Sequence, residues 1–139
     1  MPFVQIFLSA ETDAPSRKEI SLSVHESLKA IYGIPENDYF QVIHEVKPGD
    51  LIFPPSYLGI PHGDRVVYIQ ILARQGRTPE MKQALYRSIA EKVAERTTLP
   101  KEDVIIVLTE NTSENWSFGQ GEAQMLDPNW QKRTELDKT

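Results

Sequence analysis

Residues 34–45 read IPENDYFQVIHE and residues 99–110 read LPKEDVIIVLTE, so that Pro35 matches Pro100 and Asp38 matches Asp103. Carrying the same offset back along the chain aligns further apolar residues of the two halves. The aligned sets are Val4, Ile6 and Leu8 with Ile69, Ile71 and Ala73, and Ile20, Val24 and Leu28 with Leu85, Ile89 and Val93. The sequence therefore predicts two copies of one strand, helix, strand unit, at about residues 2–46 and 66–111.

Both predicted helices carry one apolar face. Apolar residues at positions 20, 24, 28 and 31, and again at 81, 85, 89 and 93, follow the drift of a single helix face. Asp13 and Thr78 are candidate N-caps, with a competing capping box at Ser16 and Glu19, and Gly33 suits a left-handed C-cap. We therefore expect two amphipathic helices, each packing one side inward.

The strands expected at 66–72 and 104–108 are nearly continuous apolar runs, which is typical of strands covered on both faces. Two helices cover only one face of a four-stranded sheet, so the other face needs a partner, and self-association is the natural solution. The prediction is an α+β domain over residues 1–126, with a loop at 47–65, a short strand within it at 50–53, and a polar tail at 127–139.

Composition narrows the class of protein. The chain has 139 residues, a net charge of −5 and no cysteine. A negative charge disfavours binding to nucleic acid, and the absence of cysteine excludes disulfides and thiolate chemistry. No segment is apolar for long enough to cross a bilayer and no secretion signal is evident, so we expect no membrane partner and a cytoplasmic location.

Pro2 is the first candidate for chemistry. Removal of Met1 would turn its ring nitrogen into a secondary amine at the start of a strand. An unperturbed α-amino group has a pKa of about 7.7–8.0 and can serve as a base or as a proton donor near neutral pH. In a parallel crossover, Asp38 falls at the same end of the sheet as Pro2. A nearby carboxylate raises the pKa of the amine and favours the proton donor.

Arg74 and Arg77 follow the third predicted strand, and guanidinium groups can hold a substrate carboxylate through paired hydrogen bonds. The strand arrangement places them away from Pro2 of the same unit, unless the sheet order or an assembly brings them back. Trp116 and Phe118 lie in a glycine-rich stretch without periodicity, where aromatic side chains can wall a pocket or anchor the core. The three histidines have no metal-site spacing, so no metal is expected.

The chain resembles the tautomerase superfamily, in its malonate semialdehyde decarboxylase-like branch. The resemblance rests on four motifs: Met1-Pro2, GIPEND at 33–38, Gly76-Arg77-Thr78, and Glu110-Asn111 followed by WSFGQG at 116–121. It implies a doubled β-α-β fold, a homotrimer and no cofactor. It also implies that Pro2 is the catalytic amine with Asp38 beside it, that Arg74 and Arg77 bind the carboxylate of a small substrate, and that Trp116 and Phe118 line the pocket.

Two reactions on a small oxo acid stay open. Neutral Pro2 would act as a base in keto–enol tautomerisation, whereas cationic Pro2 would act as an acid, or form an iminium, in decarboxylation. Two residues separate Arg74 from Arg77, where the decarboxylase pattern commonly has one, so the arginine that makes the main contact stays open too. The alternative from another class is a non-catalytic oligomeric binding or signalling protein with the same fold.

Overall fold

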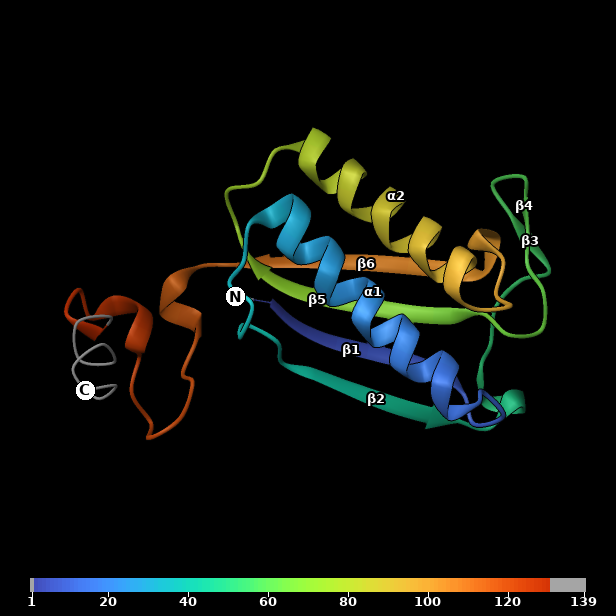
Figure 1. Ribbon diagram of the computed structural model, residues 1–139, viewed down its shortest axis with the longest axis horizontal. Helices are drawn as coiled ribbons and strands as arrows, with labels where there is room; N and C mark the ends of the chain where they lie inside the picture. Colours follow the sequence, from blue (N-terminus) through green and yellow to red (C-terminus); the bar gives the residue numbers. More distant parts are fainter. Residues whose placement is uncertain (1, 131–139) are drawn as a thin grey trace.

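The structure is a computed structural model that describes residues 2–130. Its main sheet has the strand order β2-β1-β5-β6, in which β1 is parallel to β2, antiparallel to β5, and β5 is parallel to β6. The four strands are β1 (Pro2–Ser9), β2 (Gln41–Val46), β5 (Val67–Arg74) and β6 (Val104–Asn111). Figure 1 shows helices α1 (Ala14–Tyr32) and α2 (Pro79–Arg96) side by side on one face of this sheet. The predicted α+β fold is confirmed.

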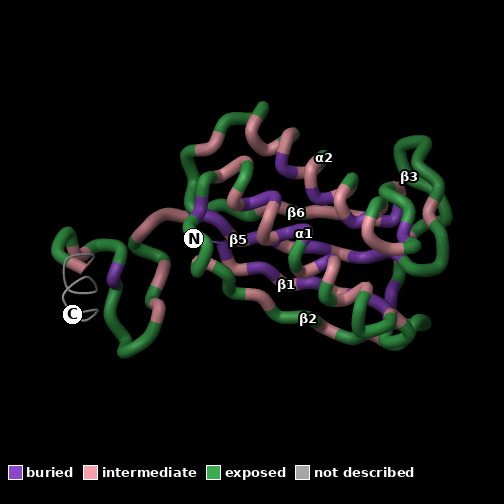
Figure 2. Tube along the Cα trace, in the orientation of Figure 1, coloured by how far each residue is buried: buried purple, intermediate pink, exposed green. Residues whose placement is uncertain are grey.

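The core lies between the sheet and the two helices. The even-numbered residues of β1 and the odd-numbered residues of β5 are buried on the helix side, which is the alternation that a strand with one covered face requires. From the helices, Ile20, Val24 and Leu28 of α1 meet Leu85, Ile89 and Val93 of α2 in the same cluster. Figure 2 shows the buried trace concentrated along β1 and β5. The residues that align between the two halves are the residues that build the core.

The helix ends follow the predicted signals. Asp13 Oδ1 accepts a hydrogen bond of 2.8 Å from the Ser16 amide, and Thr78 Oγ1 accepts one of 3.2 Å from the Met81 amide. The Asp13 cap is therefore the one used, and the competing start at Ser16 is not. Gly33 ends α1 at a φ of 66°, in the left-handed region that favours glycine. This turn sends the chain toward β2.

The face of the sheet opposite the helices carries a row of polar contacts. Gln5 donates to the Gln70 Oε1 atom at 3.1 Å, and its own Oε1 lies 3.0 Å from His44 Nε2. Phe7 stacks on the His44 ring with centroids 4.5 Å apart, and Val107 of β6 is 53% exposed. No helix in the part of the chain that the structure describes covers this face (Figure 1). This face is therefore uncovered in the single chain, and self-association on this side remains a prediction.

The loop between the halves differs from the prediction. Residues 50–53 do not form a strand; a short 3-10 helix, Pro48–Asp50, comes first, and the hairpin strands β3 (Ser56–Tyr57) and β4 (Ile60–Pro61) follow. Two consecutive prolines after Phe53 lack amide donors and prevent continuation of a strand there. Figure 1 places this hairpin at the end of the sheet remote from the N-terminus.

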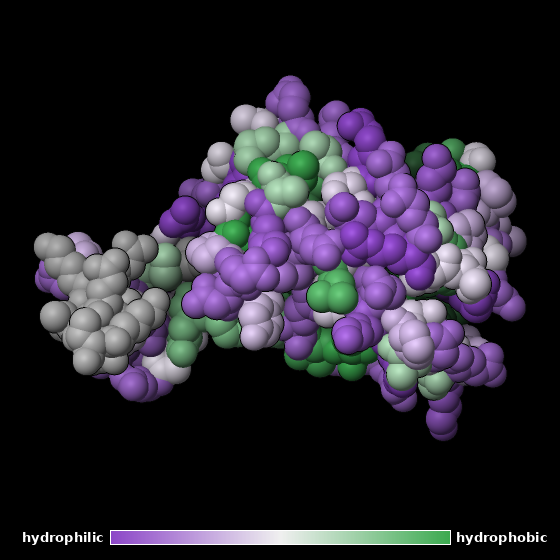
Figure 3. All heavy atoms as spheres, viewed as in Figure 1, coloured by the Kyte–Doolittle hydropathy of each residue, from purple (hydrophilic) through white to green (hydrophobic). Residues whose placement is uncertain are grey.

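Of the predicted tail, only residues 127–130 belong to the described part of the chain, and the remainder lies outside it. Neither helix of the described residues combines the length and apolar content that crossing a bilayer would need. In Figure 3, which views the molecule from the helix side, hydrophilic side chains cover much of the two helices.

Candidate active site

Most of the predicted site residues lie at one end of the sheet. β1 and β2 begin there while β5 and β6 end there, at the left in Figure 1. The parallel register pairs Val4 with Gln41, and the Val4 amide donates to the Phe40 carbonyl at 2.9 Å. Pro2, two residues before Val4, and Asp38, three before Gln41, consequently lie at the same end of neighbouring strands.

Of the possibilities that the sequence left open, the sheet order is the one that brings the arginines near Pro2. Because β1 runs antiparallel to β5, Pro2 is opposite Ala73, and Arg74 is the next residue along. A single chain therefore brings the start of β1 to the arginine-bearing end of β5, and no second subunit is needed for this approach. The repeat shows two similar units but not that their first strands pair with each other, so the sequence left this point open.

A pocket of about 540 Å³ opens at this end of the sheet. Of the predicted site residues, it brings together Asp38, Arg74, Arg77 and Phe118. Trp116 lines a neighbouring cavity of about 290 Å³, which it shares with Phe118. Two guanidinium groups and one carboxylate give this pocket a net positive charge that suits a small anion. The site is therefore assembled from the segment before β2, the end of β5 and the segment after β6.

Pro2 is buried at the start of β1 and is not among the side chains that line these two cavities. Its neighbours do line them: Phe3 faces the smaller cavity, and Arg74, which follows the residue opposite Pro2, faces the larger one. The Pro2 ring thus lies next to the pocket wall and does not itself line the pocket.

A tight turn fixes the arginines. Gln75 donates its amide to the Asn111 carbonyl at 2.7 Å, which ties the turn to the end of β6. Gly76 has a φ of 120°, a conformation that residues with a Cβ rarely adopt. Arg77 Nη1 then donates back to the Arg74 carbonyl at 2.8 Å. The two side chains therefore project from one short, constrained segment.

Tyr32, which the sequence analysis did not single out, lines the same pocket. The Arg77 guanidinium carbon lies 4.5 Å from the centre of its ring. Burial raises the pKa of the Tyr32 hydroxyl above its usual value, against the lowering effect of the Arg77 charge, so the hydroxyl stays protonated near neutral pH. One signal was available: a β-α-β crossover returns the chain to the start of the first strand, and Tyr32 ends the first crossover helix.

Aromatic side chains form one wall of the site. Trp116 stacks on Phe118 with centroids 5.5 Å apart, and Phe118 packs 5.4 Å from Phe40. The Trp116 Nε1 atom donates to Asn111 Oδ1 at 2.7 Å. Phe40 joins this wall because it directly precedes β2, which the sequence analysis did not anticipate. Such a wall excludes water and strengthens charge interactions inside the pocket.

The Gln124 side chain holds this wall in place. It is buried, accepts a hydrogen bond from the Phe118 amide at 2.8 Å and donates to the Gly119 carbonyl at 2.7 Å. Replacing Gln124 with leucine, which has no such groups, removes both hydrogen bonds, each of which contributes about 0.5–1.5 kcal/mol. We expect a lower melting temperature and a reduced kcat/KM, measured by thermal unfolding and steady-state kinetics. Unchanged kinetics in the folded variant would mean that Gln124 does not control the wall.

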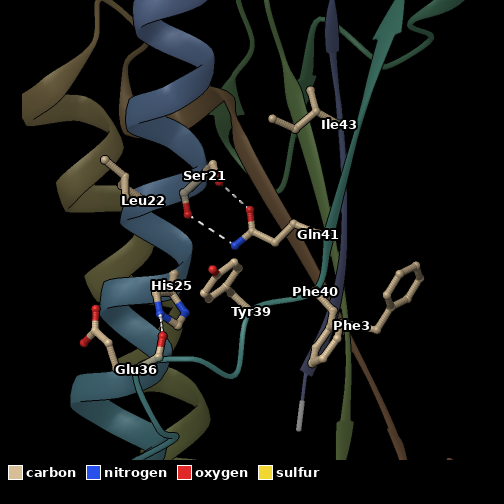
Figure 4. A pocket seen from close by; sticks show the side chains of 9 residues that line it. All are labelled: Phe3, Ser21, Leu22, His25, Glu36, Tyr39, Phe40, Gln41 and Ile43. Atoms are coloured by element: carbon tan, nitrogen blue, oxygen red, sulfur yellow. Dashed lines mark hydrogen bonds between the residues drawn. The ribbon is translucent and has the colours of Figure 1, made fainter. Parts of the chain in front are cut away.

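A larger cavity, of about 750 Å³, lies elsewhere, between α1 and the edge strand β2. Figure 4 shows Gln41 reaching from β2 to Ser21 on α1, where its Oε1 accepts a hydrogen bond of 2.6 Å, while His25 Nε2 donates to the Glu36 carbonyl at 2.9 Å. No arginine or lysine lines this cavity. It therefore lacks a permanent positive charge to bind a carboxylate, and the smaller pocket is the better candidate.

The second copy of the repeated motif has a structural role. Asp103 is 3% exposed, and its Oδ1 accepts a hydrogen bond of 2.8 Å from the Gly63 amide. A side chain at Gly63 would meet the Asp103 carboxylate at 2.7 Å, so glycine is required for this approach. Asp103 thus fastens the inter-repeat loop to the sheet, while its counterpart Asp38 lines the pocket.

The described residues contain no group of three or more histidine, aspartate or glutamate side chains arranged to hold a metal ion. His25 and His62 instead contact backbone carbonyls, and His44 contacts Gln5. Each histidine therefore has a structural partner.

Comparison with known proteins identifies the family. Two family models described as tautomerase enzyme match residues 2–60 and 38–119. The probable tautomerase YusQ of Bacillus subtilis (strain 168) is 41% identical over 127 residues, which span 91% of this chain and 100% of that protein.

Solved structures agree. FG41 malonate semialdehyde decarboxylase, solved with the inhibitor 3-bromopropiolate, superposes with a TM-score of 0.83 and 34% identity, covering 88% of this chain and 92% of that one. A fused 4-OT, solved as a symmetric trimer, shares the fold with a TM-score of 0.72 and 16% identity, covering 86% and 94% of the two chains. The chain belongs to the tautomerase family of enzymes, in the branch that contains malonate semialdehyde decarboxylase.

Proposed function

We propose that this enzyme uses Pro2, freed by removal of Met1, as an acid or base on a small oxo acid. The observation that carries the proposal is the antiparallel register of β1 and β5, which sets Pro2 beside the Arg74 end of a pocket that also holds Asp38 and Arg77. The arginines would bind the substrate carboxylate. The Pro2 nitrogen would then accept or donate the proton that is exchanged near the substrate carbonyl.

Two reactions fit this arrangement. In tautomerisation, neutral Pro2 removes a proton from the carbon next to a 2-oxo acid carbonyl and returns it elsewhere on the molecule. In decarboxylation, cationic Pro2 polarises the carbonyl of a 3-oxo acid, and the electrons released by loss of CO₂ move into an enol; alternatively, neutral Pro2 attacks the carbonyl, water leaves to give an iminium, and loss of CO₂ gives an enamine. Asp38 favours the second because a carboxylate stabilises the charged amine. Membership of an enzyme family argues against a purely binding role.

The direct test is a pair of assays on protein whose N-terminal residue is known from its intact mass. We expect protein that begins at Pro2 to tautomerise phenylenolpyruvate or to decarboxylate malonate semialdehyde. Equal activity in protein that keeps Met1 would contradict the proposal, because an acylated proline nitrogen can neither accept a proton nor form an iminium.

We further propose a homotrimer. In the single chain, the open face of the sheet carries the exposed Val107 and the half-buried Phe7–His44 stack, and the fused 4-OT that shares this fold is a symmetric trimer. Self-association would cover this face and leave the α1–α2 layer outside. Sedimentation equilibrium should give three times the chain mass, whereas a monomer at micromolar concentration would contradict this assembly. The proposed substrate is a small carboxylate, and the proposed location remains the cytoplasm.

The repeated aspartates give a matched comparison. Asp38→Asn removes a charge from the pocket, and we expect a fall of about tenfold in decarboxylation, with the limb of the pH–rate profile that reports deprotonation of Pro2 moving about one pH unit lower. The direction follows because loss of the carboxylate lowers the pKa of the amine. Asp103→Asn should instead lower the melting temperature and leave this limb in place. Identical pH profiles for wild type and Asp38→Asn would exclude an electrostatic role for Asp38.

A further inference from the structure

Of the two pocket arginines, Arg77 has the more restrained side chain, and a carbonyl and an aromatic ring restrain it rather than a carboxylate. One N–H group of its guanidinium donates to the Arg74 carbonyl at 2.8 Å, and the group lies over the Tyr32 ring at 4.5 Å. No carboxylate within residues 2–130 forms an ion pair with it. Glu110, the acidic group whose charge acts on Tyr32, pairs with Lys82 Nζ at 2.6 Å instead.

The nature of this contact matters for a residue that must bind an anion. A carboxylate partner would hold Arg77 equally well, but it would neutralise the positive charge and occupy N–H donors. An aromatic face attracts the cation through the quadrupole of the ring and uses none of the five N–H groups. Arg77 is therefore restrained while its charge and most of its donors stay available.

The Tyr32 ring itself is fixed by the fold. It is the last residue of α1 before the Gly33 turn, and it packs against the core between the helices and the sheet. Its hydroxyl oxygen is buried and has no hydrogen-bond partner in the described chain. The hydroxyl thus contributes no contact that explains this side chain, whereas the ring face does.

We propose that Tyr32 is a positioning residue for carboxylate recognition: its ring holds the Arg77 guanidinium at the pocket without consuming the charge or the donors that bind the substrate. This inference rests on the proposed function in one respect, namely that Arg77 contacts the substrate carboxylate. Tyr32 acts through Arg77 and takes no part in proton transfer.

The test uses Tyr32→Met, which fills a similar volume without an aromatic face, and Tyr32→Phe, which keeps the ring. Tyr86→Met, a neighbouring tyrosine on α2, is the matched control. We expect Tyr32→Met to raise KM for the reacting oxo acid about tenfold with kcat changed less than about threefold, as loss of a partly desolvated cation–π contact predicts. Tyr32→Phe should restore KM, and Tyr86→Met should not alter it.

A double-mutant cycle isolates the pair. In an Arg77→Met background, Tyr32→Met should add less than about a twofold rise in KM, because its effect runs through Arg77. The same tenfold rise in both backgrounds, or equal behaviour of Tyr32→Met and Tyr32→Phe, would overturn the proposal. Circular dichroism and melting temperatures establish that each variant is folded.

A binding measurement separates this inference from the proposed role of Pro2. Malonate has carboxylate groups but is not a substrate of either reaction. It is titrated into each protein, and its binding is followed by NMR. We expect its Kd to rise about tenfold in Tyr32→Met and to change little in Pro2→Ala. Full activity of Pro2→Ala would refute the proposed function alone, whereas an unchanged malonate Kd in Tyr32→Met would refute the role of Tyr32 alone.

Discussion

Pro2→Ala should lower kcat by about 100-fold or more, since a positioned acid or base typically contributes 10²–10⁴-fold to a reaction. The variant keeps an α-amino group after removal of Met1, but it loses the ring that fixes this nitrogen at the start of β1. The nitrogen then becomes a freely rotating primary amine, and the proton-transfer geometry is lost. Steady-state kinetics on phenylenolpyruvate and malonate semialdehyde measure the loss.

The control for this experiment is a protein with an uncleaved N-terminal extension. It keeps the Pro2 ring in place but converts its nitrogen into an amide, and it should lose as much activity as Pro2→Ala. Intact masses define each N-terminus, and equal melting temperatures exclude unfolding as the cause. If either protein retained the full rates of both reactions, the Pro2 nitrogen would have no catalytic role.

Removal of either pocket arginine is expected to raise KM about tenfold or more, because hydrogen bonds to a charged group are worth about 1.5–3 kcal/mol. The variants are Arg74→Met and Arg77→Met, and Arg87→Met on the exposed side of α2 controls for the lost charge. The double variant Arg74→Met/Arg77→Met should no longer saturate with substrate. Substrate-saturation curves provide the measurement.

The relative size of the two arginine effects carries information. The Arg77 side chain is held by Tyr32 and by the Arg74 carbonyl, whereas within residues 2–130 no ring contact, hydrogen bond or ion pair restrains the exposed Arg74 guanidinium. A pre-organised group loses less conformational entropy on binding, so we expect Arg77→Met to have the larger effect. If KM changed no more in these variants than in Arg87→Met, neither arginine would bind the carboxylate.

Much of the fold could be predicted because its signals are local. The caps at Asp13 and Thr78 and the left-handed turn at Gly33 depend on neighbouring residues, and the core positions follow from helix and strand periods. Because the sequence repeats, each element predicted in one half also predicts its counterpart in the other half. The common position of Pro2 and Asp38 followed from the geometry of one parallel crossover.

The features that were missed depend on contacts between distant segments. The pairing of β1 with β5, which brings Arg74 to Pro2, is a choice of strand order that leaves no mark in either strand. Tyr32 over Arg77 and Gln124 across the Phe118 backbone likewise join segments that no periodicity connects. The strand expected at 50–53 is absent for a local reason, because Pro54 and Pro55 follow its apolar residues and have no amide to donate to a sheet.

The central claim is that the ring nitrogen of Pro2 exchanges the proton of the reaction, and ¹⁵N NMR of proline-labelled enzyme tests it most directly. With Met1 removed, the Pro2 resonance should titrate, and its midpoint should coincide with an apparent pKa of the kcat/KM profile of the free enzyme. A Pro2 nitrogen that shows no titration across the pH range in which the enzyme gains and loses activity would contradict the account.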